Sequence, residues 1–164
     1  MSEPPSKRAR WVDFHCHLDL YSDHAELIAE CDRERVATLA VTTTPKAWER
    51  NRELATDAVL VRVALGLHPQ LVAERAAEIG LFESLLPDAR YVGEVGLDAS
   101  PRFYRSFDAQ EHVFERILRM CAEQGNKILT VQRPCGFEGL AAPGESIANR
   151  SWACRASLVH RLCF

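Results

Sequence analysis

Several features that mark other classes of protein are missing from this sequence. Its six cysteines include no Cys-x-x-Cys pair, which excludes a zinc knuckle built on such pairs and gives no sign of a secreted disulfide framework. No apolar run approaches the roughly 20 residues that a membrane helix needs, and the N-terminus lacks the apolar core of a signal peptide. We therefore expect a cytoplasmic protein with free thiols and no membrane partner.

An excess of basic residues is missing as well. The formal net charge is −3, so the chain has no overall positive field of the kind that drives non-specific binding to nucleic acids. One short basic segment, residues 7–10, is typical of a solvated tail, and we expect residues 1–11 to form such a flexible tail. The remaining composition, 47% hydrophobic and 26% charged, predicts a soluble globular domain.

Between residues 12 and 131 the sequence alternates apolar runs with amphipathic segments. The expected strands are Val12–His15, Ala37–Thr42, Val61–Leu67, Tyr91–Val95 and Lys127–Val131, and the expected helices are Ala25–Arg35, Lys46–Thr56, Leu71–Leu85 and Ala109–Gln124. Such repeats predict a parallel sheet with helices outside it, and polar motifs after successive strands favour a barrel over a doubly wound sheet. The predicted fold class is α/β: the N-terminal part of a TIM-type (β/α)8 barrel with about five strand–helix units, left incomplete.

The first polar motif is His15-Cys16-His17, at the end of the first expected strand. Two imidazoles at positions i and i+2 of an extended strand point to the same side, so both can reach one divalent cation. A bare pair of this kind also occurs by chance at strand ends, which leaves a purely structural role open. The later motifs decide between these readings.

Two further polar motifs follow the third and fourth expected strands. They are Gly66–Pro69, which contains His68, and Gly93–Asp98, which contains Glu94. In a barrel the loops at the carboxyl ends of the strands form one rim, so these groups are expected to converge with the first motif. A glutamate there can bridge two cations, and a neutral imidazole can bind a metal or hold a phosphate oxygen. The weaker candidates are Asp19 and Asp98.

Three segments together resemble the TatD family of metal-dependent deoxyribonucleases: Asp13–Asp19, Ala64–Pro69 and Val92–Asp98. The surrounding residues, Val41–Pro45 and Leu67–Gln70, are closest to the TatD-like nucleases of Qat anti-phage defence systems. The resemblance covers residues 12 to 131. It implies a barrel that hydrolyses DNA phosphodiester bonds with divalent metal, two ions of magnesium, manganese or zinc in the complete site.

The resemblance also implies roles for single residues. His15 and His17 would hold one metal ion, and Glu94 would bridge it to a second. Glu94 and His68 would be the catalytic residues, with His68 near the substrate phosphate. DNA would be the substrate, and other proteins of a defence system would be partners.

The pattern departs from the family at the fifth expected strand. The family has His-Ser-Arg there, and this chain has Gln132-Arg133, whose amide is a poor substitute for the imidazole of the second metal shell. The alternation then stops, the later family motifs are absent, and His160 imitates one of them without a strand–helix context. Because another reading frame of plausible codons permits the family motifs, we expect residues 132–164 to be an out-of-frame or non-native tail.

A truncated barrel has consequences for stability and activity. Its edge strands at Val12 and Lys127 would be unpaired, and a two-metal centre would be incomplete, so hydrolysis is expected to be impaired. Two alternatives stay open. One is another metal-dependent hydrolase, an amidohydrolase or a phosphoesterase, and the other is a non-catalytic half barrel that binds a partner. Glu94 stands where some amidohydrolases carry a bridging lysine, which favours the nuclease.

Overall fold

The computed structural model of the protein describes residues 8–133 and 158–159. Its strands are β1 (Trp11–Cys16), β2 (Val36–Val41), β3 (Val61–Leu65), β4 (Tyr91–Gly96), β5 (Ile128–Gln132) and β6 (Leu158–Val159). Its α-helices are α1 (His24–Arg33), α2 (Pro45–Leu54), α3 (Val72–Arg75), α4 (Ile79–Leu85) and α5 (Phe107–Gln124). Short 3-10 turns occupy Leu18–Leu20, Pro69–Leu71, Ala76–Glu78, Leu86–Asp88 and Tyr104–Ser106.

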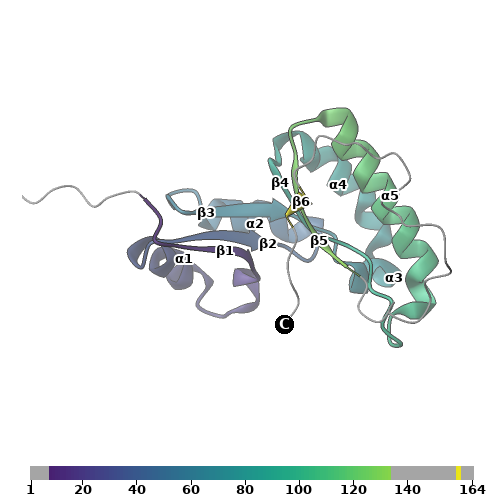
Figure 1. The fold of residues 1–164 in the computed structure, drawn as a ribbon, viewed down its shortest axis with the longest axis horizontal. Coiled ribbons are helices and arrows are strands. Elements are labelled where there is room, and N and C mark those ends of the chain that lie inside the picture. The colour runs from purple at the N-terminus through teal and green to yellow at the C-terminus, as the bar shows by residue number, and fades with distance from the viewer. Residues whose placement is uncertain (1–7, 134–157, 160–164) are drawn as a thin grey trace, which may run out of the picture.

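The six strands form one parallel sheet in the order β1-β2-β3-β4-β5-β6, so each strand lies beside the next one along the chain. Figure 1 shows the sheet curling between β3 and β4, with α1 outside the first strands and α3, α4 and α5 outside the last ones. The result is a half barrel with external helices. The predicted fold class, an incomplete TIM-type barrel of α/β architecture, is confirmed.

The two edges of the half barrel differ from each other. At one edge β1 pairs with β2 alone among the described strands, as expected for an open edge. At the other edge the expectation of an unpaired strand is not met, because β5 carries the two-residue strand β6, with Leu129 opposite Leu158. β1 begins at Trp11, inside the expected tail of residues 1–11. Residues 134–157 and 160–164, including His160, lie outside the described residues, as do residues 1–7.

Two expected elements are shorter than predicted. The single helix expected over Leu71–Leu85 is divided into α3 and α4, because Arg75 adopts a φ of −120° and a ψ of 4° and so leaves the helical conformation. The strand expected over Val61–Leu67 ends at Leu65. Beyond it, Gly66 N donates to the side chain of Thr42 and Leu67 N donates to Glu94 O in β4, outside the regular ladder between β3 and β4.

The main hydrophobic core lies between the sheet and helices α2, α4 and α5. Its fully or almost fully buried members are Trp48, Leu65, Leu67, Val72, Phe82, Leu86, Ala89, Val92, Val95, Ile117, Met120, Cys121 and Leu129. A smaller cluster under α1 contains Leu18, Ile28, Ala40 and Val61. Apolar burial of this kind is the main stabilising contribution to a fold, so the β3–β5 side is the better packed part of the sheet.

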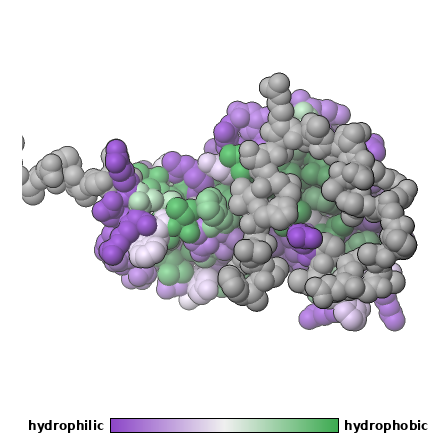
Figure 2. Space-filling view, viewed as in Figure 1, coloured by the Kyte–Doolittle hydropathy of each residue, from purple (hydrophilic) through white to green (hydrophobic). Residues whose placement is uncertain are grey.

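The first strand contributes little to either core. Trp11, Val12 and Phe14 are each more than half exposed. Figure 2 shows apolar side chains facing the viewer over the region where β1 and β2 lie in Figure 1. No helix in the described part of the chain has the length and apolar character needed to cross a membrane.

Candidate metal centre

The two histidines of the first motif lie at the end of β1, the strand at the open edge of the sheet. His15 lies in β1 where the register is irregular: from Asp13 to Cys16 the strand advances three residues while β2 advances two, from Thr38 to Ala40. Such an extra residue turns a side chain out of the regular alternation. His17 follows the strand and begins the turn Leu18–Leu20. The simple i, i+2 picture of an extended strand is therefore replaced by a bulge and a turn, which still bring the two rings together.

Glu94 lies in a second irregularity of the same kind. From Val92 to Val95 strand β4 advances three residues while β5 advances two, from Leu129 to Val131. The carboxylate is almost completely buried, with a relative exposure of 7%. Both strands that supply the candidate metal ligands thus carry an extra residue at the ligand itself, which is the position where bulges re-aim functional side chains.

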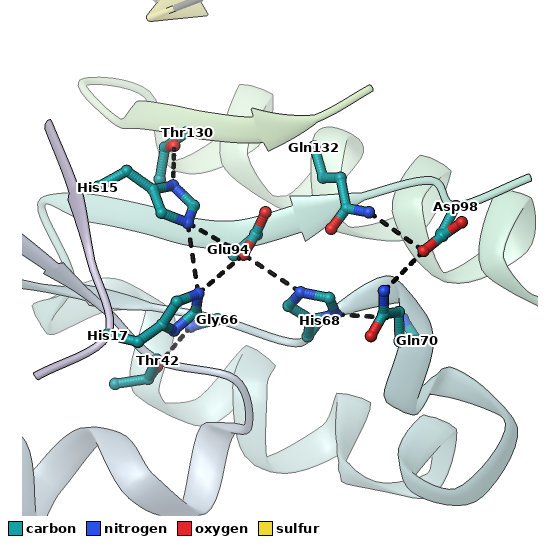
Figure 3. Close-up of polar contacts among 10 residues, drawn as sticks. All are labelled: His15, His17, Thr42, Gly66, His68, Gln70, Glu94, Asp98, Thr130 and Gln132. Atoms are coloured by element: carbon teal, nitrogen blue, oxygen red, sulfur yellow. Dashed lines mark hydrogen bonds and ion pairs between the residues drawn. The ribbon is translucent and has the colours of Figure 1, made fainter. Parts of the chain in front are cut away.

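Three imidazoles converge on one oxygen of this carboxylate, as Figure 3 shows. Glu94 Oε2 lies 3.1 Å from His15 Nε2, 3.1 Å from His17 Nε2 and 3.2 Å from His68 Nε2. The Nε2 atoms of His15 and His17 are 3.3 Å apart. The structure therefore brings together all four residues that the sequence singled out as metal ligands or catalytic groups.

A divalent cation fits the group formed by His15, His17 and Glu94. These three residues offer ligand atoms within 4.8 Å of one another. Two imidazole nitrogens and a carboxylate oxygen are a common set for zinc, and ligands at the corners of a tetrahedral zinc site lie about 3.3–3.6 Å apart. The observed separations of 3.1–3.3 Å are close to that spacing before any ion is added. The donors are thus arranged to surround a small cation.

The electrostatics favour an ionised carboxylate. Burial alone would raise the pKa of Glu94, but the hydrogen bonds with His15, His17 and His68 outweigh it and hold that pKa far below its usual range. The hydrogen bond with Glu94 raises the pKa of His17, while burial opposes this shift. Without a cation the site is therefore held together by charge-assisted hydrogen bonds between the rings and the carboxylate.

The backbone beneath Glu94 is packed too closely for larger side chains. Thr42, completely buried after β2, donates its hydroxyl to Ala64 O at 2.9 Å and accepts from Gly66 N at 3.0 Å. Glu94 N donates to Thr42 O at 3.1 Å. A Cβ at Gly66 would lie 1.8 Å from Thr42 O and 2.6 Å from Glu94 N. The glycine thus allows the ends of β2, β3 and β4 to meet directly below the site.

A comparison with protein families identifies the chain. The family model described as TatD related DNase matches residues 12–131. The chain belongs to the TatD family. The matched residues include His15, His17 and Glu94, the group that could hold a metal ion.

Among solved structures, the chain is similar to YjjV, a TatD homolog from Escherichia coli K12, with 24% identity and a TM-score of 0.65. The match covers 76% of this chain and 52% of YjjV, so the chain spans about half the length of that TatD relative. This likeness shows the same fold. Among curated proteins no relative matches the chain.

The weaker acidic candidates of the TatD motifs do not join the three-ligand group. Asp98 is buried, and its Oδ2 accepts from Gln70 Nε2 at 2.8 Å and from Gln132 Nε2 at 3.3 Å. Burial raises the pKa of Asp98, but hydrogen bonds from Ser100, Gln70 and Gln132 lower it below its usual value overall. Asp19 Oδ1 is buried without a hydrogen-bond partner in the described residues. Its charge acts on His17, whose pKa it helps to raise.

Sequence reasoning missed two groups that contact the predicted residues of this TatD site. Thr130 lies in β5, is buried, and places Oγ1 at 3.4 Å from His15 Nδ1. Gln70 contacts His68 through its backbone and Asp98 through its side chain. A polar residue inside the otherwise apolar fifth strand was the signal for Thr130. Gln70 closes the motif Leu67–Gln70, but nothing in the sequence assigned it a role of its own.

Proposed function

We propose that the chain binds a divalent cation through His15, His17 and Glu94 and is a TatD-type hydrolase of DNA phosphodiester bonds by descent. The convergence of three ligand atoms at the spacing of a cation site carries this proposal. Two imidazoles favour zinc or manganese over magnesium, which prefers a shell of oxygens. DNA as the substrate rests on the family, since the net charge of the chain is slightly negative.

The chain's own residues have distinct roles in this proposal. When bound, a cation at this site would polarise a phosphoryl oxygen as a Lewis acid. His15 and His17 hold it from the open edge of the sheet, and Glu94 holds it from the buried strand β4. His68 Nε2 lies 3.2 Å from the same carboxylate oxygen, where the ring can orient Glu94, and the family resemblance implies a place for His68 near the substrate phosphate.

We also propose that hydrolysis is impaired. In the complete family site two cations stabilise the attacking and leaving oxygens, and one group of three ligands occurs in the described part of this chain. Gln132, at the end of β5, donates to Asp98 and contributes an amide where the family has an imidazole. A role within a Qat-type anti-phage system is proposed from the resemblance of the residues Val41–Pro45 and Leu67–Gln70 to those nucleases.

The first experiment measures cation binding to the metal-free chain by calorimetry with zinc or manganese. We expect one bound ion per chain. The variants His17→Ala and Glu94→Gln each remove a ligand, so each should lose more affinity than the roughly 10–100-fold that is typical when an outer-shell residue is changed. His112→Ala is the matched control, because His112 is exposed on α5 and its hydrogen bond within the described residues is with Asp108 O of its own helix. Equal binding by the His17→Ala chain would contradict the assignment.

The same proteins are then tested for cleavage of labelled single- and double-stranded DNA. We expect turnover at least about 100-fold below that of a complete TatD barrel, equivalent to about 3 kcal/mol of lost transition-state stabilisation. Turnover as fast as the complete enzyme would overturn the impairment. Cation binding without any DNA cleavage would favour the partner-binding half barrel, a reading that the exposed side chains of β1 support.

A further inference from the structure

The ring of His68 differs from those of the two proposed ligands in what its other nitrogen contacts. Gln70 N donates to His68 Nδ1 at 3.2 Å. A backbone amide can only donate, so Nδ1 must accept and the neutral ring carries its hydrogen on Nε2. That nitrogen faces Glu94 Oε2 at 3.2 Å, so the N–H of His68 points at the carboxylate.

The outer contact of His15 is with a hydroxyl, which can donate or accept, and not with a backbone amide. Its Nδ1 lies 3.4 Å from the hydroxyl of Thr130, which can accept a hydrogen from the ring. When a cation is bound, a hydrogen on Nδ1 leaves Nε2 with the lone pair that a metal ligand needs, whereas in the metal-free chain Nε2 hydrogen-bonds to Glu94. His15 and His68 contact the same carboxylate oxygen, but their Nδ1 atoms have different partners. The contact with Thr130 allows His15 to be a metal ligand, and the contact with Gln70 makes His68 a hydrogen-bond donor.

The side chain of Gln70 is held in place by a hydrogen bond to Asp98. Its side-chain amide donates to Asp98 Oδ2 at 2.8 Å, and Asp98 is 4% exposed. Asp98 is held in turn by Ser100 N at 2.8 Å on Oδ1 and by Gln110 Oε1, which accepts from its backbone amide at 2.7 Å. Figure 3 shows the resulting line of contacts from Asp98 through Gln70 and His68 to Glu94.

We propose that Asp98 and Gln70 hold His68 in the tautomer with its hydrogen on Nε2, so that His68 donates to Glu94 and does not bind the cation. Asp98 and Gln70 are then positioning residues, and Asp98, a weak candidate from the sequence, acts through His68. The proposal rests on the proposed function for the presence of a cation, but the tautomer of His68 is a property of the chain alone.

Nuclear magnetic resonance tests it directly. In the ¹⁵N-labelled chain, long-range proton–nitrogen spectra distinguish a protonated ring nitrogen from a bare one, and His68→Asn assigns the signals. We expect Nε2 of His68 to be protonated before and after addition of zinc, while Nε2 of His15 and of His17 shifts on zinc binding. A hydrogen on Nδ1 of His68, or loss of its Nε2 hydrogen with zinc, would overturn the proposal.

The role of Gln70 is tested with a matched pair of substitutions on the same carboxylate. Gln70→Leu and Gln132→Leu each remove one amide donor from Asp98. We expect a mixture of His68 tautomers and roughly 10-fold weaker zinc binding in Gln70→Leu only, in line with outer-shell changes at metal sites. An unchanged His68 tautomer in Gln70→Leu, or an equal change in both variants, would exclude the positioning role.

A variant that fails to fold would be recognised by its collapsed amide spectrum, and Gln70→Met then replaces Gln70→Leu under the same expectation. Failure of this inference is distinguishable from failure of the proposed function. Absence of zinc binding in the unchanged chain would contradict the proposed function while the tautomer of His68 is still measured. A wrong tautomer with normal zinc binding would contradict the inference alone.

Discussion

Strand β1 with the residue that follows it and strand β4 supply the ligands of one site, yet the two strands lie in opposite environments. In β4 every residue after Tyr91 is buried, and the strand pairs on both sides. In β1 the first four residues are exposed, and β2 is its one described neighbour. Both strands carry an extra residue at the ligand. The two ligand-bearing strands therefore share the bulge at the ligand but differ in how deeply they are buried.

This contrast indicates where the site is rigid. Glu94 belongs to the best packed strand, whereas His15 and His17 belong to an edge that few apolar contacts hold in place. Segments with few buried contacts open first in native proteins. A cation that joins the two strands would stabilise the edge by mass action, since binding favours the folded state.

The largest expected loss of stability follows a substitution at Gly66, where the backbone just after β2 lies closest to the glycine. Gly66→Ala would place a methyl group 1.8 Å from Thr42 O, and backbone atoms cannot move aside as side chains do. We expect a loss of about 3 kcal/mol or more in the free energy of unfolding, at the upper end for overpacking. Gly80→Ala is the control, because a Cβ there meets nothing within 4 Å and alanine in helix α4 should gain about 0.5–1 kcal/mol. Urea unfolding of both variants measures the difference, and equal midpoints would contradict it.

The next prediction compares the loss of stability caused by the same change, valine to alanine, in β4 and in β1. Val92→Ala in β4 removes two methyl groups from a completely buried side chain and should cost about 2 kcal/mol, at about 0.8 kcal/mol for each group plus a cavity. Val12→Ala in β1 starts from a side chain that is 57% exposed, so its effect should stay within about 0.5 kcal/mol. Thermal or urea unfolding measures both. Similar losses would show that β1 is packed as tightly as β4, contrary to the described contacts.

The smallest effect concerns the hydrogen bond that joins the two regions. The lowered pKa of Glu94 contributes stability that is present above its ordinary value of 4.5 and lost as the pH falls. The raised pKa of His17 contributes stability that is present below 6.5 and lost as the pH rises through the folded value. The metal-free chain should therefore gain most from this pair between pH 4.5 and 6.5. His17→Gln should flatten the alkaline side of the stability profile, and an unchanged profile would contradict the assignment.

The architecture was predictable because each strand is a continuous apolar run and each unit repeats the same order. The boundaries of β2 and α5 lie within two residues of the predicted ones. The break between α3 and α4 was not predictable, since the segment Leu71–Leu85 has the apolar spacing of one helix. Its division depends on the backbone of Arg75 and on the ion pairs of Arg75 and Lys46 with the buried Glu78.

The candidate site was predictable as a set of residues but not as a geometry. His15, His17, His68 and Glu94 follow from motifs at strand ends. The bulges that bring them together depend on pairing between strands that are distant in sequence, which a pattern along one segment does not contain. The same limit hid Thr130 and Gln70, whose importance lies in which ring nitrogen they contact.

The order of the strands also bears on how the chain assembles during synthesis. Because each strand pairs with the one made just before it, the sheet can grow unit by unit as the polypeptide leaves the ribosome. The three ligand side chains and His68 belong to the first four strand–loop units, so all four are present once β4 has formed. Thr130, behind His15, arrives one unit later with β5. A nascent chain that has just completed β4 would thus already hold its cation ligands, before their outer support is made.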